Sequence, residues 1–333
     1  MTDVMTNPPL SLTRMASALR YLDALDEIEG WLCPTTALAM IEVLWEQERL
    51  GAVGDIAEIG IWRGKSFLAL AAGARPGERL VAVDPFDAGD SLAQRPDLDV
   101  APYGTGYKAK FLENLACFFP GVQPDVIEAS SAALDQSAFG SLRVLSIDGN
   151  HSREQTFSDL RLAAACLTEQ GVCWLDDVFN GAWPGVISGL FAYLDSASSL
   201  QPVALFPNKL VLVRPGTAQA WRDRLRVLFG WATERQGVEL HNFHIDVYRD
   251  VGSDFAPAFR LTDPTSRRAS AQRVLEADAA LSACQTHLLA AEQRALEAEQ
   301  RVLDAEAALS ACKASTSWRL TSPLRGLATA LRR

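Results

Sequence analysis

Short apolar segments alternate with segments of helical pattern between Asp55 and Arg214, and this alternation constrains the fold more than any other feature of the sequence. The apolar segments are GDIAEIG, RLVAVD, DVIEAS, LRVLSID and GVCWLDD, followed by a hairpin-like pair, QPVALF and KLVLVR. Helical patterns cover residues 12–29, 35–50, 65–74, 108–119, 156–167 and 186–194. Short, continuously apolar strands joined through helices are typical of a mainly parallel sheet with both faces covered. The sequence therefore predicts an α/β fold with flanking helices.

The composition changes near Pro264. From residue 271 to 312 the sequence contains no glycine, proline or aromatic residue, and heptad positions a (from Val274) and d (from Ala277) are all apolar or small. This pattern predicts a C-terminal coiled-coil helix; a single amphipathic helix folded back on the enzyme body is the alternative. We therefore expect four parts, namely an N-terminal helical segment (1–33), a catalytic domain (34–262), a coiled coil (263–314) and a basic amphipathic tail (315–333).

The overall composition fits a soluble globular protein, with 48% hydrophobic and 22% charged residues. No apolar run reaches the roughly 18 residues of a spanning helix, and MTDVMTNPPL lacks the features of a secretory signal, so we expect a cytoplasmic protein. The net charge of −10 argues against a nucleic-acid partner. Six cysteines without a CxxC pair indicate reduced thiols rather than a zinc site or a disulfide scaffold.

The first strand leads into a glycine-containing turn, Glu58-Ile59-Gly60-Ile61-Trp62-Arg63-Gly64-Lys65-Ser66, and the second strand ends at Asp84. Ligands of such sheets bind at the carboxyl ends of the strands. A dinucleotide site requires G-x-G-x-x-G, but Trp62 stands at the second glycine of that pattern. The turn therefore disfavours a pyrophosphate and leaves room for a nucleoside ligand, with Asp84 placed to accept hydrogen bonds from a ribose. An ordinary connection between strand and helix is the alternative.

Three carboxylates follow the fourth and fifth strands, Asp148 after LRVLSI and Asp176-Asp177 after GVCWL. Because parallel strands end at the same edge, we expect these like charges to meet there and to require protons or a cation. Magnesium prefers such oxygen ligands. His151, three residues after Asp148, is within reach of a metal-bound hydroxyl as a general base. As alternatives, one aspartate of the pair caps the next helix and His151 is an ordinary loop residue.

Four motifs in combination resemble those of the class I S-adenosylmethionine-dependent methyltransferases. They are E-I-G-x-x-x-G-x-S, a strand-end Asp, V-L-x-I-D-G-x-H and G-V-x-x-L-D-D-V-F-N-x-x-W-P-G-V. They are most similar to the metal-dependent branch that includes macrolide sugar O-methyltransferases and cephalosporin-hydroxylase-like proteins. The resemblance spans residues 55–214 and implies a Rossmann-like sheet. Many members carry a glycine where Trp62 stands.

The resemblance also implies a role for each motif residue. Asp84 would bind the cofactor ribose, and Ser130 or a neighbour would lie near the adenine. The methionine part of the cofactor would be surrounded by Glu58, Gly60, Gly64 and Ser66, and magnesium would be held by Asp148, Asp176 and Asp177.

The expected reaction is O-methylation. The cation would lower the pKa of a substrate hydroxyl, His151 or Asp148 would take its proton, and the alkoxide would attack the sulfonium methyl group. Trp183, with Tyr103 and Tyr107 from the long loop 85–107, is predicted to stack on a sugar ring. Packing of Trp183 against the next helix, and a surface loop for the two tyrosines, are the alternatives.

The tail, STSWRLTSPLRGLATALRR, resembles tails of bacterial glycosyltransferases and companion enzymes of surface polysaccharide synthesis. From Lys313 onward it contains five basic residues and no acid, so it is suited to an anionic membrane surface. A terminus that serves only solubility or subunit docking is the alternative.

We therefore expect a magnesium-dependent O-methyltransferase for a sugar hydroxyl in bacterial surface glycan biosynthesis. It would form homo-oligomers through the coil and bind peripherally to the inner face of the membrane or to a polysaccharide-assembly partner. A methyltransferase for a small secondary metabolite, or a non-catalytic scaffold of a polysaccharide complex, are the alternatives. A nicotinamide enzyme is disfavoured by Trp62.

Overall fold

The structure is a computed structural model of the 333-residue chain. It describes residues 12–86, 106–196 and 198–252, together with scattered residues between 276 and 311, all of which are α-helical. The chain divides into two compact units, Met1–Ser270 and Ala271–Arg333. The described residues do not include Tyr103, most of the loop 85–107, most of the predicted coiled coil or any of the basic tail. Self-association through the coil therefore stays a prediction.

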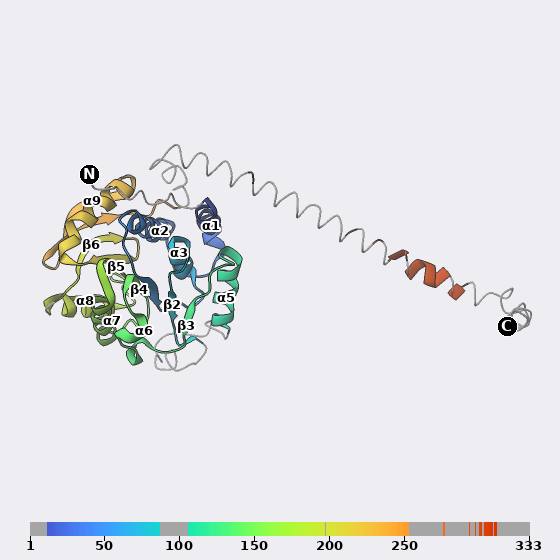
Figure 1. Cartoon of the computed structure of the whole chain (residues 1–333), viewed down its shortest axis with the longest axis horizontal. Coiled ribbons are helices and arrows are strands. Elements are labelled where there is room, and N and C mark those ends of the chain that lie inside the picture. Colours follow the sequence, from blue (N-terminus) through green and yellow to red (C-terminus); the bar gives the residue numbers. More distant parts are fainter. Residues whose placement is uncertain are drawn as a thin grey trace, which may run out of the picture. The chain divides into compact units, whose positions relative to one another are not determined.

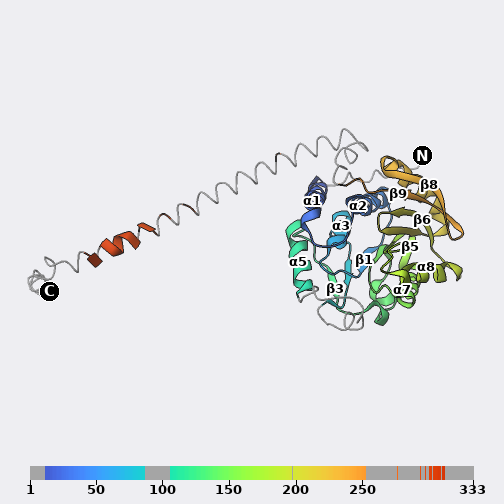
Figure 2. The same ribbon diagram turned by 180° about the vertical axis from the view of Figure 1, so that it is seen from behind.

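A single mixed sheet forms the centre of the first unit (Figures 1 and 2). Within the described residues it has nine strands in the order β3-β2-β1-β4-β5-β7-β6-β9-β8. Their bounds are β1 Asp55–Ile59, β2 Leu80–Val83, β3 Asp125–Ile127, β4 Leu142–Ile147, β5 Leu167–Asp176, β6 Gln201–Phe206, β7 Lys209–Val213, β8 Thr233–Leu240 and β9 Phe243–Tyr248. Strands β1 to β5 are parallel, β7 is antiparallel to β5 and β6, and β8 is antiparallel to β9. This confirms the predicted Rossmann-like α/β sheet.

Helices cover both faces of the sheet (Figures 1 and 2). One face packs against α1 Leu12–Asp23, α2 Pro34–Arg49, α3 Lys65–Gly73, α5 Tyr107–Phe118 and α9 Ala218–Phe229. The other packs against α6 Gln136–Phe139, α7 Arg153–Cys166 and α8 Pro184–Asp195. Pro34 begins α2, as its fixed φ favours at a first helical position.

Burial on both faces explains why the strand sequences are continuously apolar. Every residue of β2, β4 and β7 is buried. The predicted hairpin-like pair QPVALF and KLVLVR forms β6 and β7, and residues 218–248 add α9 and the β8–β9 hairpin to this body. No described helix combines the length and hydropathy needed to cross a bilayer.

The strand order reverses between β1 and β4, and ligands of doubly wound sheets bind at such a point. There the backbone N–H of Gly60 donates to the carbonyl of Val83 over 2.8 Å, and the N–H of Asp148 donates to the carbonyl of Ile59 over 2.7 Å. These bonds bring the ends of β1, β2 and β4 together and position the site.

Candidate functional site

The glycine turn after β1 lies directly against the end of β4. Gly60 has φ +86°, and a Cβ atom there would lie 1.9 Å from the carbonyl oxygen of Asp148. Gly64 has φ +83°, and a Cβ atom there would lie 2.4 Å from the Cδ2 atom of Phe111. Both positions therefore require glycine, for space as well as for backbone conformation.

Asp84 holds this turn in place. Its Oδ2 atom accepts hydrogen bonds from the backbone N–H groups of Ile61 (2.6 Å) and Trp62 (2.9 Å), and its Oδ1 atom accepts one from Phe86 (2.6 Å). Trp62 itself has a left-handed backbone, with φ 48°. Because a carboxylate offers about four lone-pair sites, Asp84 retains capacity for a ribose hydroxyl. Ribose binding by Asp84 stays a prediction.

Glu58 is fully buried within β1, where its Oε1 atom accepts a hydrogen bond from the Ser146 hydroxyl over 2.8 Å. Burial raises the pKa of Glu58 to about 7, against the opposing effects of Lys209 and of the Ser66 and Ser146 hydroxyls. The predicted cofactor residues Glu58 and Ser66 are therefore neighbours. Glu58 can gain or lose a proton near neutral pH.

Two further predicted ligand residues lie near other elements, Ser130 after β3 and Tyr107 at the start of α5. Ser130 is exposed after β3, and its Oγ atom accepts a hydrogen bond from the backbone N–H of Ala132 over 3.3 Å. Tyr107 is buried at the start of α5, with its ring centroid 6.4 Å from that of Trp62. Their roles toward adenine and substrate stay predictions.

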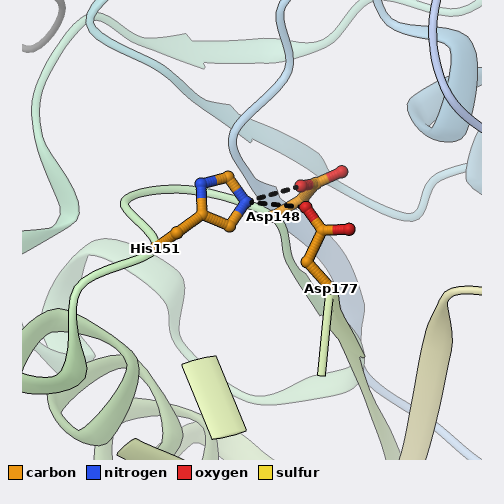
Figure 3. A group of neighbouring side chains, drawn as sticks. All are labelled: Asp148, His151 and Asp177. Atoms are coloured by element: carbon orange, nitrogen blue, oxygen red, sulfur yellow. Dashed lines mark ion pairs between the residues drawn. The ribbon is translucent and has the colours of Figure 1, made fainter. Parts of the chain in front are cut away.

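One nitrogen of the His151 ring faces the carboxylates of two of the predicted metal ligands (Figure 3). Its Nε2 atom is 3.1 Å from Oδ2 of Asp177 and 3.7 Å from Oδ1 of Asp148. Each of the three residues offers a ligand atom within 4.8 Å of the other two, so this group can hold a metal ion. The structure thus brings together the predicted base and two of the three predicted metal ligands.

The imidazole ring of His151 is fixed in its orientation. It stacks on Trp183 with ring centroids 4.6 Å apart and an interplanar angle of 17°. Burial lowers the pKa of His151, but hydrogen bonding and charge attraction from Asp148 and Asp177 outweigh it, and the net pKa is raised. Trp183 therefore contacts the predicted base, in addition to its predicted role toward substrate.

Asp176, the third predicted metal ligand, is instead paired with a lysine that the sequence analysis did not select. Lys209 begins β7, and its Nζ atom lies 2.7 Å from Oδ2 of Asp176 and 3.4 Å from Oδ2 of Asp148. Both Lys209 and Asp176 are buried. Burial lowers the pKa of Lys209, but the surrounding carboxylates raise it well above its ordinary value, so the ammonium group stays charged.

A hollow of about 270 Å³ lies beside this cluster, between the ends of β5, β6 and β9. The Asn180 side chain, which contributes to its wall, donates a hydrogen bond to Oδ1 of Asp177 over 3.0 Å. The backbone carbonyl of Asn208, in the β6–β7 turn, accepts one from the Asp177 N–H over 2.9 Å. The lining of the hollow consists of Phe179, Asn180, Leu205, Phe206, Pro207, Asn208 and Tyr248.

An aromatic pair borders the glycine turn on its other side. Trp31 stacks on Trp62 with ring centroids 4.9 Å apart and an interplanar angle of 22°, and Trp31 is 69% exposed. The Arg63 guanidinium group lies 5.0 Å from the Trp62 ring centroid and also pairs with Glu29. Sequence reasoning missed this pair because it depends on how residues 28–33 pass over the turn.

Comparison with known protein families gives a match to the central part of the chain. A family model described as "Methyltransferase domain" matches residues 57–178, which confirms the resemblance to methyltransferases. No curated protein matches the chain.

Solved structures with similar backbones include three O-methyltransferases. The O-methyltransferase NovP has 14% sequence identity and a TM-score of 0.45, over 61% of this chain and 96% of its own. CalS11, described as a TDP-rhamnose 3'-O-methyltransferase of calicheamicin biosynthesis, has 20% identity and a TM-score of 0.40. The match covers 65% of this chain and 100% of CalS11. An O-methyltransferase from Bacillus cereus in complex with SAH has 14% identity and a TM-score of 0.41. The match covers 63% of this chain and 92% of the Bacillus cereus protein.

Proposed function

We propose that the chain, whose residues 57–178 match a family model described as "Methyltransferase domain", transfers a methyl group from S-adenosylmethionine to the oxygen of a sugar hydroxyl. The observation that supports oxygen as the acceptor atom is that the Nε2 atom of His151 faces Asp148 and Asp177, which follow β4 and β5 at their carboxyl ends. A histidine flanked by carboxylates is suited to removing a hydroxyl proton.

The residues around the glycine turn suit the cofactor. Gly60 leaves no side chain between the turn and the end of β4, Gly64 leaves none between the turn and Phe111 of α5, and Asp84 fixes the backbone of Trp62. When bound, S-adenosylmethionine supplies the methyl group on a positively charged sulfonium. We assign cofactor binding to Glu58, Gly60, Gly64, Ser66, Asp84 and Ser130.

The cluster of Asp148, His151 and Asp177 fits a divalent cation, since its possible ligand atoms converge within 4.8 Å of one another. When bound, such a cation lowers the pKa of a hydroxyl that it coordinates. Magnesium is the ion predicted from the carboxylates, whereas an imidazole ligand is better suited to ions such as zinc or iron.

His151 and Asp148 are the two candidates for proton acceptor. The Nε2 atom of His151 faces the carboxylates of Asp148 and Asp177, whose negative charges stabilise the imidazolium ion that proton uptake would form. Stacking on Trp183 keeps the ring in this orientation. In an enzyme where His151 ligates the cation, Asp148 would take the proton instead.

We propose a glycan as the acceptor, and the basic tail with its resemblance to enzymes of surface polysaccharide synthesis supports this choice. The hollow beside Asp177 and the Trp31–Trp62 pair offer apolar surfaces of the kind on which sugar rings stack. A small secondary metabolite is the second candidate, because neither surface distinguishes a free sugar from another ring-bearing alcohol. The non-catalytic scaffold is disfavoured, because a scaffold has no need for acids at several strand ends.

Two measurements test this function. Calorimetry should show binding of S-adenosylhomocysteine and no binding of NAD; absence of any nucleoside binding would refute the methyltransferase proposal. Transfer of labelled methyl groups onto a panel of nucleotide-linked, lipid-linked and polymeric glycans, read by mass spectrometry, would then identify the acceptor. Loss of transfer on exhaustive chelation would support a cation, and undiminished transfer would argue for proton removal by His151 without one.

The C-terminal segments carry a separate proposal. We assign homo-oligomer formation to residues 263–314 and binding to an anionic membrane or an assembly partner to residues 315–333. Truncation after residue 264 should abolish self-association in sedimentation experiments and abolish binding to anionic liposomes, while S-adenosylhomocysteine affinity is retained. Unchanged sedimentation of the truncated chain would contradict the coiled coil.

A further inference from the structure

The sheet places one buried ammonium group among the site carboxylates. Strand β7 lies antiparallel beside β5 with Lys209 opposite Asp176, so the start of β7 meets the end of β5. The Lys209 side chain is 1% exposed, and its Nζ atom lies 2.7 Å from Oδ2 of Asp176 and 3.4 Å from Oδ2 of Asp148. A charge buried to this degree needs close partners of opposite charge.

The pairing changes what Asp176 can do. Its side chain is 3% exposed, and the oxygen nearest Lys209 is engaged by the ammonium group. A divalent cation sharing that oxygen would be close to another positive charge and would be repelled by it. By contrast, Asp177 is directed toward His151, and its other oxygen accepts a hydrogen bond from Asn180.

Lys209 also orients Asp148. One oxygen of Asp148 faces the ammonium group at 3.4 Å, and the other faces the Nε2 atom of His151 at 3.7 Å. The carboxylate is therefore held between two basic side chains. This arrangement directs one of its oxygens into the group that contains His151 and Asp177.

We propose that Lys209 is a positioning residue that selects the ligands of the cation: it withholds Asp176, so that the ion is bound by Asp148, His151 and Asp177. This inference rests on the cation that the proposed function includes. Charge supports it as well, because Lys209 offsets the charge of Asp176, whereas Asp148 and Asp177 retain negative charge that a divalent ion neutralises.

The test is calorimetric titration of the chelator-treated full chain with Mn²⁺. Lys209→Met removes the charge of the lysine but keeps a long, unbranched side chain at this position. Asp176→Asn/Lys209→Met removes both charges of the pair and so preserves the net charge of the site. The double variant also avoids an unpaired buried carboxylate, so it keeps the proposal testable where the single variant fails to fold. Arg143→Met is the matched control, because Arg143 is an equally buried cation that pairs with Glu78 at the other end of β4.

We expect Lys209→Met to bind Mn²⁺ about tenfold more tightly or better, since Asp176 becomes available and a positive charge is lost. The double variant should stay within about threefold of the wild type, Asp177→Asn should lose about tenfold or more, and Arg143→Met should not change. If the double variant bound Mn²⁺ about tenfold more weakly than the wild type, Asp176 would be a ligand and the proposal would be overturned. A Lys209→Met variant that bound Mn²⁺ no more tightly than the wild type would also overturn it.

Binding of S-adenosylhomocysteine by the same samples separates the two proposals. If the wild type binds no S-adenosylhomocysteine, the methyltransferase function fails, while the Mn²⁺ comparison still decides the role of Lys209. If neither the wild type nor any variant binds Mn²⁺, the Lys209 proposal is overturned, while S-adenosylhomocysteine binding still supports the methyltransferase. Mn²⁺ binding that appears only in Lys209→Met would also overturn the proposal, because the three proposed ligands would then fail to bind the ion in the wild type.

Discussion

The Nε2 atom of His151 lies 3.1 Å from Oδ2 of Asp177, although the two residues follow different strands. Asp177 has a left-handed backbone, with φ 59°, and its N–H donates to the carbonyl of Asn208. This bond to the β6–β7 turn holds the backbone of Asp177 and thereby helps to direct its carboxylate toward the imidazole. The contact depends on three separate segments of the chain, and it puts a titratable ring at the predicted point of proton transfer.

His151→Gln should lower kcat for methyl transfer by about 10²- to 10⁴-fold, because glutamine supplies neither a proton-accepting imidazole nor the imidazole ligand of the proposed cation. Steady-state kinetics with the identified acceptor would measure this loss, and calorimetry should show S-adenosylhomocysteine affinity within about twofold of the wild type. His244→Gln, at an exposed position on β9, is the matched control and should keep full activity. Retention of kcat in His151→Gln would leave Asp148 as the proton acceptor.

The positions of Asp84, Asp148 and Asp177 could be predicted because each follows a short apolar strand. Parallel strands end at a common edge, so strand identity alone brings their following residues together. The same reasoning located the glycine turn, whose backbone the structure shows against Asp148. Local pattern was sufficient for these residues, since no detail of strand register was needed.

Lys209 was not predictable by that reasoning. Its segment KLVLVR indicates a strand, but only the insertion of β7 between β5 and β6 puts the lysine opposite Asp176. That pairing joins residues far apart in the sequence, and a shift of one residue would turn the lysine to the other face of the sheet. The stacking of Trp31 on Trp62 likewise depends on a loop path that no periodicity encodes.

Lys209→Met should destabilise the protein by about 3–5 kcal/mol near neutral pH, because it leaves Asp176 buried without its partner charge. Asp176→Asn/Lys209→Met should recover most of this loss, since a neutral pair of similar volume carries no uncompensated charge. Urea unfolding of both variants, followed by tryptophan fluorescence, would measure the difference. Equal destabilisation of the single and double variants would show that packing of the lysine stem, rather than charge, is what the site requires.

Asp159, on α7, gives a predicted pH dependence of stability that is separate from the cation site. Its side chain is buried and accepts a hydrogen bond from Gln155 over 2.8 Å. Burial raises its pKa from 3.8 to about 6, against hydrogen bonds from Gln155 and Ser131. The folded state therefore binds more protons than the unfolded state between these values, and stability falls as the pH rises through this interval.

Asp159→Asn removes this penalty, which amounts to about 3 kcal/mol once the pH exceeds the folded-state pKa. We expect the variant to be more stable than the wild type at pH 7.5 by about 2 kcal/mol, with little advantage at pH 4. Urea unfolding at both pH values is the measurement, and Glu154→Gln, an exposed position on the same helix, is the control. An advantage of equal size at both pH values would exclude ionisation of Asp159 as the cause.

Gly60 and Gly77 form a matched pair that separates steric contact from backbone conformation at the glycine turn. Both have φ +86°, but a Cβ atom at Gly60 would lie 1.9 Å from the carbonyl oxygen of Asp148, whereas nothing lies within 4 Å of one at Gly77. Gly77→Ala should therefore cost only about 1–2 kcal/mol, the strain of a left-handed alanine.

Gly60→Ala should carry the same strain and, in addition, push the turn away from Asp148, for a total of about 3 kcal/mol or more. Because the displaced turn is the one that Asp84 holds, S-adenosylhomocysteine binding should be lost in Gly60→Ala and kept in Gly77→Ala. Thermal unfolding and calorimetry on the two variants would measure both effects. If the two alanine variants lost equal stability and both bound the ligand, close contact between the turn and the end of β4 would have no part in shaping the cofactor site.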